Sequence, residues 1–559
     1  MPERWYKEAV IYCLDVETFQ DSNADGIGDL QGLIVRLDYL ARLGVTCIWL
    51  NPIHPSPGKD DGYDITNYYD VHPRIGSLGD FAELVHEAGN RGIRILIDLV
   101  INHSSIEHPW FQSSRSDPDS PYRDWYIWSR EEPPTRRQGM VFPGQQSDTW
   151  TYDTRAKAWY FHRFYDFEPS LNHSNREVQV EMRKIIGFWL QLGVGGFRMD
   201  AAPFVIEQPS PTSAEAKKSF DMLTRFTEYL NWRRGDAVIL AEANVGNDEL
   251  SDYFGDIGGS GNRLHMLFDF RMNCKLMLAL AREDAEPIVE TLMNTPRIPE
   301  TGQWATFLRN HDEVDLSRLT PSERQDVFNA FGPRPEMQLY GRGIRRRLAS
   351  MLGGDRRRLE LAYSLQFTLP GTPVLRYGEE LGMGEDLSLP ERNAIRTPMQ
   401  WFNAPNGGFS SARPEDLIRP PVKRGKYGYP KVNVTEQRLD PNSLLSWFER
   451  MIRTLRECPE IGTGQCEVVQ AAVPSHVLVH RFDAPEGSVL LLHNLGSRAV
   501  TLDLGRLPRT GADVHEMFAD GPYPPPSSRL RDLRLNGHGY RWIRLSHRAE
   551  EFSARSTPR

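Results

Sequence analysis

One carboxylate in the chain stands beside an arginine at the end of a short apolar run. Within residues 195–200, Arg198 precedes Asp200 by two positions. On a β-strand, side chains at positions i and i+2 project to the same side. A guanidinium beside a carboxylate lowers the carboxyl pKa and keeps the group ionised, as a carboxylate nucleophile requires. A structural ion pair at a strand end is the alternative explanation for this pair taken alone.

Two more acids follow later strand-like runs, and they favour a catalytic site over an isolated ion pair. Glu242 comes directly after the apolar residues 237–241, and Asp312 comes directly after residues 304–311. The strands of a parallel barrel end at one face, which is where such barrels carry their catalytic residues. We therefore predict that these carboxyl groups and Asp200 meet in one site.

Apolar runs that resemble buried strands alternate with helical segments through most of the chain. The runs that predict strands lie at residues 10–14, 45–50, 93–98, 195–200, 237–241, 304–311 and 371–378. The segments that predict helices lie at residues 33–43, 81–88, 177–192, 219–232, 359–365 and 444–455. This alternation is typical of a parallel sheet. Because polar residues follow the predicted strands, we predict an α/β fold built on a (β/α)8 TIM barrel.

Two parts of the chain depart from this rhythm. Residues 104–175 are too long for an ordinary βα loop and too aromatic for a disordered linker, so they predict a small inserted domain after the third strand. Short strands separated by turn residues predict a C-terminal antiparallel β-sandwich domain at residues 466–559. The barrel would then comprise residues 1–103 and 176–465.

The composition is that of an ordinary globular protein and excludes several classes of partner. The net charge of −9 argues against a nucleic-acid or anionic-membrane partner. Arginine clusters at residues 345–347 and 356–358 suggest nucleic acid, but the second opens a predicted amphipathic helix whose charges would form a solvated face. The five cysteines are scattered without metal-ligand spacing and predict reduced thiols. Together with an N-terminus unlike a signal peptide, they predict a cytoplasmic location. A homo-oligomer is compatible with these features.

The loop at residues 21–29 is dense in oxygen ligands. The candidate ligands are Asp21, Asn23, Asp25, Ile27 and Asp29. Hard cations such as Ca²⁺ prefer several oxygens at close range, and Gly26 permits the tight turn that gathers them. Gly32 stands where an EF-hand would place its bidentate glutamate, so the loop is not an EF-hand. A polar turn stabilised by Asx hydrogen bonds is the alternative.

Four segments in order resemble the sequence motifs of the α-amylase superfamily, glycoside hydrolase family 13. They are residues 98–103, 196–200, 240–244 and 310–312. Within the family, the chain is most similar to the trehalose synthases, isomerases that convert maltose to trehalose. This similarity lies in residues 340–347, 383–392 and 396–401. The resemblance implies the same fold, a small-sugar substrate, a structural Ca²⁺ at residues 21–29 and no organic cofactor.

The resemblance also implies roles for individual residues. Asp200 matches the nucleophile, Glu242 the general acid/base and Asp312 the carboxylate that holds the sugar. The residues that match sugar-binding positions are Asp60, Tyr63, His103, Arg198, His311 and Arg396.

The implied reaction is intramolecular transglucosylation of maltose to trehalose, accompanied by some hydrolysis. The alternative is an α-glucosidase or transglucosidase that acts on short α-linked glucosides. A non-catalytic binding protein is disfavoured, because such a protein need not retain three carboxylates and an arginine. The chain departs from typical trehalose synthases at residues 139–150, 168–172 and 207–215. These segments are expected to flank the acceptor side of the pocket. The change at residues 168–172 leaves open whether a second metal site exists near Asn102.

Overall fold

A closed barrel of eight parallel strands forms the centre of the computed structural model, which describes residues 4–210, 213–255, 261–469, 471–485, 487–505, 507 and 510–547. The order around the barrel is β1-β16-β12-β11-β10-β7-β3-β2. Their bounds are β1 Ile11–Leu14, β2 Cys47–Leu50, β3 Arg94–Leu99, β7 Gly196–Met199, β10 Val238–Ala241, β11 Met266–Phe268, β12 Gln303–Thr306 and β16 Thr372–Arg376. The predicted barrel is confirmed. The strand β11 was not predicted.

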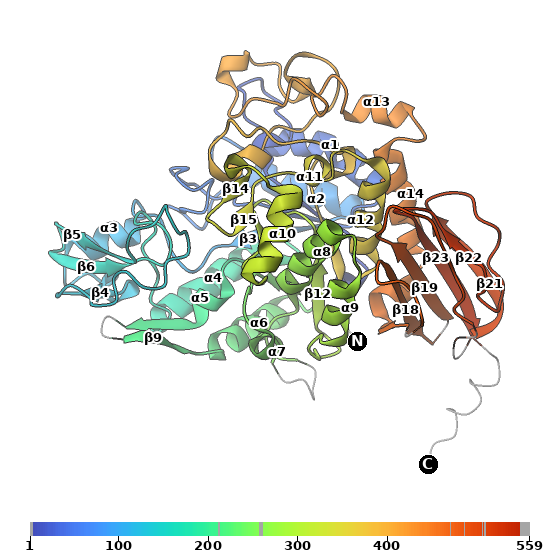
Figure 1. Cartoon of the computed structure of the whole chain (residues 1–559). Helices are drawn as coiled ribbons and strands as arrows, with labels where there is room; N and C mark the ends of the chain where they lie inside the picture. Colours follow the sequence, from blue (N-terminus) through green and yellow to red (C-terminus); the bar gives the residue numbers. More distant parts are fainter. Residues whose placement is uncertain are drawn as a thin grey trace.

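Helices surround the barrel (Figure 1). The longer ones are α1 Leu30–Leu43, α2 Leu78–Asn90, α4 Arg176–Gln191, α6 Asp221–Arg233, α8 Phe270–Arg282, α10 Pro321–Phe331, α12 Arg356–Thr368 and α14 Leu444–Arg456. The shorter ones are α5 Ala202–Ile206, α7 Asn247–Phe254, α9 Glu286–Met293, α11 Leu348–Met351, α13 Val434–Leu439 and α15 Pro459–Thr463. Each predicted helix is present, with ends shifted by a few residues.

The strands are apolar on both faces because each face is covered. Along β1, Ile11 and Cys13 pack with other strands inside the barrel, whereas Tyr12 and Leu14 pack toward the helices. All four residues of β1 are buried. This alternation explains why the strands read as continuous apolar runs in the sequence.

The segment at residues 104–175 lies between β3 and α4 and has its own small structure. It contains α3 (Pro109–Ser116) and a three-stranded sheet of order β4-β6-β5, formed by Trp128–Ser129, Ala158–Phe161 and Trp150–Asp153. Figure 1 shows this sheet on the opposite side of the molecule from the C-terminal strands. The hairpin of β8 (Glu207–Ser210) and β9 (Ser213–Lys218) follows α5.

Antiparallel strands form the C-terminal part, as predicted. One sheet has the order β17-β18-β19-β23-β21 and the other pairs β20 with β22. Their bounds are β17 Gln465–Val468, β18 Val477–Ala484, β19 Gly487–Asn494, β20 Val500–Leu502, β21 Thr510–Ala519, β22 Leu533–Leu535 and β23 Tyr540–His547. A second three-stranded sheet in the barrel loops joins β13 (Val314–Asp315), β15 (Gly343–Ile344) and β14 (Gln338–Leu339). In the part of the chain that is described, no helix has the length and apolarity to cross a membrane.

The two arginine clusters have different environments. Arg357 in the second cluster has a side chain that is 67% exposed, as expected for a solvated face. The first cluster faces inward instead: Arg346 pairs with Glu385 at 2.8 Å and the buried Arg347 pairs with Glu379 at 3.2 Å. These arginines are committed to internal ion pairs, which explains their presence without nucleic acid.

Gly196 at the start of β7 is required by close packing of neighbouring strands. Its φ is +148°, and a Cβ added there would lie 2.1 Å from the carbonyl oxygen of Val238 in β10. We therefore expect Gly196→Ala to lower the free energy of unfolding by about 1–3 kcal/mol, measured by urea denaturation.

The matched control is Gly89→Ala in α2, where an added Cβ meets nothing within 4 Å. There the expected change is stabilisation of up to about 1 kcal/mol, because alanine favours the helix. Equal stability of the two variants would contradict this account of Gly196.

Candidate active site

A single buried guanidinium connects three acidic side chains at the carboxyl ends of neighbouring strands. Arg198 in β7 donates from Nη1 to Oδ1 of Asp98 at 3.0 Å and to Oδ1 of Asp200 at 2.6 Å. Its Nη2 donates to Oε2 of Glu242. Asp98 is the last residue but one of β3 and is paired in register with Arg198, and Glu242 follows β10, the strand on the other side of β7. The predicted juxtaposition of Arg198 and Asp200 is therefore present, and Asp98 joins it.

Burial and charge act in opposite directions on these acids. Burial raises the pKa of Glu242 to about 8, although Arg198 acts to lower it. Burial also raises the pKa of Asp200, and Arg198 offsets only part of that rise. The expectation that Arg198 lowers the pKa of Asp200 below its usual value is wrong, because desolvation outweighs the ion pair. Glu242 is consequently suited to hold a proton at neutral pH, as a general acid must.

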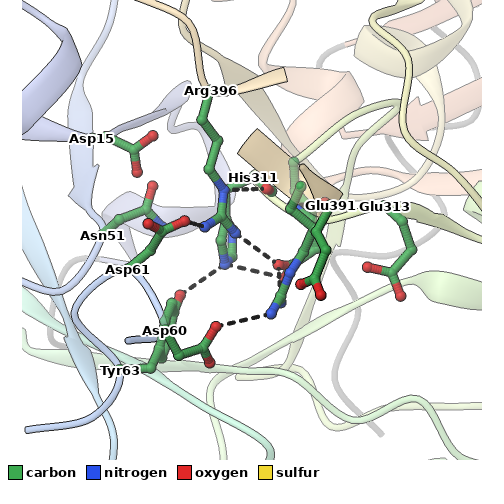
Figure 2. Close-up of polar contacts among 12 residues, drawn as sticks. Asp15, Asn51, Asp60, Asp61, Tyr63, His311, Glu313, Glu391 and Arg396 are labelled. Atoms are coloured by element: carbon green, nitrogen blue, oxygen red, sulfur yellow. Dashed lines mark hydrogen bonds and ion pairs between the residues drawn. The ribbon is translucent and has the colours of Figure 1, made fainter. Parts of the chain in front are cut away.

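The third predicted acid is held by two arginines that both come from the loop after β16. Oδ1 of Asp312 accepts from Nη1 of Arg392 at 2.7 Å and from Nη2 of Arg396 at 3.1 Å (Figure 2). Nε2 of His311 lies 3.1 Å from its Oδ2. Burial alone would raise the pKa of Asp312, but His311, Arg392 and Arg396 hold it well below its usual range. Asp312 is therefore an anion, whereas Glu242 tends to be protonated.

The predicted sugar-binding residues lie around these acids. The hydroxyl of Tyr63 is 2.7 Å from Nε2 of His311, and their rings stack with centroids 5.8 Å apart. Asp60 accepts from Nη2 of Arg392 at 3.1 Å. Nε2 of His103 is 3.2 Å from the carbonyl oxygen of Tyr63. These contacts join one polar wall beside Asp200 and Glu242, formed by Asp60, Tyr63, His103, His311, Asp312 and Arg392.

A cavity of about 950 Å³ opens over this wall. Of the predicted residues, Asp60, Tyr63, His103, Asp200, Glu242, His311 and Asp312 line it. Arg198 and Arg396 lie behind the lining and contact its acids instead. Such a cavity is large enough for a small sugar of one or two rings, since ligand pockets typically span about 300–1,000 Å³.

Sequence reasoning missed two residues of the site. Arg392 lines the cavity and bridges Asp60 and Asp312, and it stands in the segment 383–392 that carried the resemblance. Glu168 is fully buried, with Oε1 3.6 Å from Nε2 of His103. No apolar periodicity marks either residue, because Glu168 lies in a bend and Arg392 in the short 3-10 helix Glu391–Ile395.

The oxygen-rich loop at residues 21–29 is closed by its own backbone amides. Asp21 accepts from the amides of Asn23, Ala24 and Gly26 at 2.8–3.0 Å, and Asn23 and Asp25 each accept from the amide two residues later. Asp29 accepts from Gly32 and caps α1. Among the described residues, no group of three or more His, Cys, Asp or Glu is placed to hold a metal ion. The Asx-turn network predicted as the alternative is present, and a cation would have to share these oxygens with it.

An eight-stranded parallel barrel that presents three carboxyl groups and a buried arginine at its carboxyl ends defines a class: enzymes that cleave or transfer glycosides by carboxylate chemistry. Residues 13–328 and 344–464 match the family model described as "Alpha amylase, catalytic domain". The chain belongs to the α-amylase family.

Similar proteins include several named as trehalose synthases. The chain is 42% identical over 544 residues to the "Trehalose synthase" of Thermus thermophilus, covering 97% of this chain and 55% of that protein. It is 40% identical to the "Trehalose synthase/amylase TreS" of Mycobacterium tuberculosis, covering 97% of this chain and 90% of that protein. Among solved structures, the α-amylase from H. orenii superposes with a TM-score of 0.77 at 26% identity, covering 97% of this chain and all of that one.

The pKa of Glu242 predicts the alkaline limit of activity. A general acid acts in its protonated form, so with Glu242 in that role kcat/KM should be retained below pH 8 and fall about tenfold per pH unit above it. The measurement is a pH profile of kcat/KM with a natural glycoside. A nitrophenyl glycoside, whose leaving group needs little protonation, serves as the control and should show a weaker alkaline decline. Equal declines for both substrates would contradict the assignment of Glu242 as general acid.

Proposed function

We propose that this protein converts maltose to trehalose by intramolecular transfer of an α-glucosyl group, with hydrolysis as a side reaction. The observation that carries the proposal is that Asp200, Glu242 and Asp312 line one cavity of about 950 Å³, with Arg198 donating to the first two. The proteins named as trehalose synthases, about 40% identical over 97% of the chain, support maltose as the substrate.

The reaction proceeds in two steps, formation of a glucosyl-enzyme on Asp200 and transfer of the glucosyl group to the released glucose. Asp200 attacks the anomeric carbon of the non-reducing glucose while Glu242 donates its proton to the departing glycosidic oxygen, so the C1–O bond breaks and a glucosyl-enzyme forms. The released glucose stays in the cavity and turns to present its anomeric hydroxyl. Glu242, now a carboxylate, takes that proton as the oxygen attacks C1 and displaces Asp200. Attack by water in place of glucose gives hydrolysis.

Binding of the donor glucose is assigned to the polar wall. The ionised Asp312, fixed by Arg392 and Arg396, accepts hydrogen bonds from sugar hydroxyls. Asp60 and Tyr63 close the end of the cavity beyond the donor glucose. A closed end favours substrates with one glucosyl unit beyond the scissile bond. Action on disaccharides should therefore exceed action on starch.

Incubating the purified protein with maltose tests the proposal directly. We expect trehalose as the main product and free glucose as a minor one, with the glucose share rising as temperature loosens the loops over the acceptor. Asp200→Ala, Glu242→Gln and Asp312→Asn should each nearly abolish both products while circular dichroism shows an unchanged fold. Glucose without trehalose would establish the α-glucosidase alternative, which the 30% identity to an "Oligo-1,6-glucosidase" also favours.

We also propose that the loop at residues 21–29 binds a structural Ca²⁺. Its density of carboxylate and amide oxygens supports the proposal. Because the amide network already shapes the loop, bound metal should add stability rather than create the fold. Its sole chemical contribution would be to neutralise these carboxylates.

Chelation tests the calcium proposal. Treatment with EDTA should lower the melting temperature by several degrees, and added Ca²⁺ should restore it. Asp25→Ala, which removes an exposed candidate ligand, should abolish the calcium-dependent part of the shift. A melting temperature that is indifferent to both EDTA and Ca²⁺ would leave the amide-closed turn as the whole explanation.

The same proposal extends to location and assembly. Five free cysteines, four of them buried, support a reducing compartment such as the cytoplasm. Size-exclusion chromatography with light scattering would determine whether the chain forms a homo-oligomer.

A further inference from the structure

The guanidinium of Arg396 makes hydrogen bonds within the protein and does not line the cavity. Nε donates to the carbonyl oxygen of His311 at 2.8 Å, Nη2 to Oδ1 of Asp312 at 3.1 Å, and Nη1 to Oδ2 of Asp61. The side chain is only 3% exposed. Because each of its three nitrogens already donates to a protein oxygen, Arg396 acts on substrate through Asp312.

Asp61 holds Arg396 from the side away from Asp312. Its Oδ2 accepts from Arg396 and its Oδ1 accepts from Nη2 of Arg419 at 2.6 Å. Burial alone would raise the pKa of Asp61, but Arg396, Arg419 and Arg392 bring it below its usual value. Asp61 is therefore an anion between two cations. Figure 2 shows the carboxylate of Asp61 directed at Arg396, next to Asp60, Tyr63 and His311 of the polar wall.

Arg419 comes from a segment that is fastened to the oxygen-rich loop. The amide of Asp21 donates to the carbonyl of Phe409 at 3.0 Å, and the hydroxyl of Ser410 donates to Oδ2 of Asp21 at 2.5 Å. At the other end, the amide of Ile418 donates to the carbonyl of Gly26 at 3.0 Å. A Cβ at Gly26 would lie 2.2 Å from the carbonyl oxygen of Asp416, so the two segments are closely packed.

We infer that Asp61 and Arg419 are positioning residues for the donor site. In this relay of side chains, Arg419 holds Asp61, Asp61 holds Arg396, and Arg396 sets the position of the Asp312 carboxylate. The inference rests on the proposed function in one respect, the binding of the glucosyl group by Asp312. It connects the loop at residues 21–29 to catalysis through side chains that never touch the sugar. Without the anion at residue 61, Arg396 is free to leave Asp312.

Substitutions of Asp61 and Arg419 test the inference. Asp61 has φ +47°, a conformation that asparagine tolerates, so Asp61→Asn removes the charge without straining the backbone. Arg419→Met removes the second cation and keeps much of the side-chain length. Each should lower kcat/KM about tenfold, since small displacements of a binding group are costly in the transition state. Arg419→Lys should restore part of the loss.

The double variant separates a relay from two independent effects. If both residues act through Arg396, Asp61→Asn combined with Arg419→Met should lower kcat/KM by about as much as the larger single effect. Arg413→Met is the matched control, because Arg413 lies in the same segment with a side chain that is 72% exposed. It should leave kcat/KM unchanged.

Two substrates keep this test independent of the isomerase proposal. A nitrophenyl α-glucoside reports glucosyl transfer from the donor site whatever the acceptor, and maltose reports the product. Absence of trehalose from the unaltered protein would defeat the isomerase proposal and leave the relay testable with the nitrophenyl substrate. Losses that multiply in the double variant, or a lower melting temperature with unchanged kcat/KM, would overturn the relay.

Discussion

The arrangement of the site depends on one cation that the fold removes from water. Arg198 is 1% exposed, so its charge must be compensated by anions within the barrel. Neighbouring strands supply Asp98, Asp200 and Glu242, and the Trp49 ring lies 5.1 Å from the guanidinium. Three carboxyl groups around one cation leave an excess of negative charge in a buried place. Burial of the acids themselves is the largest cause of their raised pKa values, and Arg198 offsets only part of each rise. The same removal from water that makes Arg198 require anions therefore also favours a proton on Glu242.

The sequence predicted those parts of the structure that depend on local pattern. The spacing of Arg198 and Asp200 and the apolar strands required only the two-residue period of a β-strand. The strand β11 was missed because its three residues, Met266–Phe268, are too few to show a pattern. Asp98 lies in the first of the four family motifs, residues 98–103. Its contact with Arg198 nevertheless depends on the register between β3 and β7, which no single segment encodes. Arg392 was missed because the 3-10 helix that carries it, Glu391–Ile395, is too short to show a pattern.

Ion pairs hold both sides of the cavity, and they are buried to a similar degree. In the pairs that join Asp60 and Asp312 to Arg392 and Arg396, the side chains are 3–17% exposed, and breaking one leaves a charge without compensation. Arg163 pairs with Glu207 at 2.7 Å and joins the inserted segment to the β8–β9 hairpin, with side chains that are 12% and 18% exposed. The inserted segment is therefore fastened to the hairpin by a pair of the same kind as those that hold Asp312.

An aromatic cluster makes these two sides interdependent. Phe142 from the inserted segment packs against Tyr340 from the barrel loops, with ring centroids 5.1 Å apart, and against Tyr165 at 5.0 Å. The guanidinium of Arg392 lies 5.4 Å from the centre of the same Phe142 ring. The arginine that bridges Asp60 and Asp312 is thus also part of the contact that closes the inserted segment over the cavity. Under the proposed function, loss of this contact would expose the cavity to water and would also remove packing from Arg392. The ratio of hydrolysis to isomerisation would then depend on how well Phe142 stays packed on Tyr340 and Arg392.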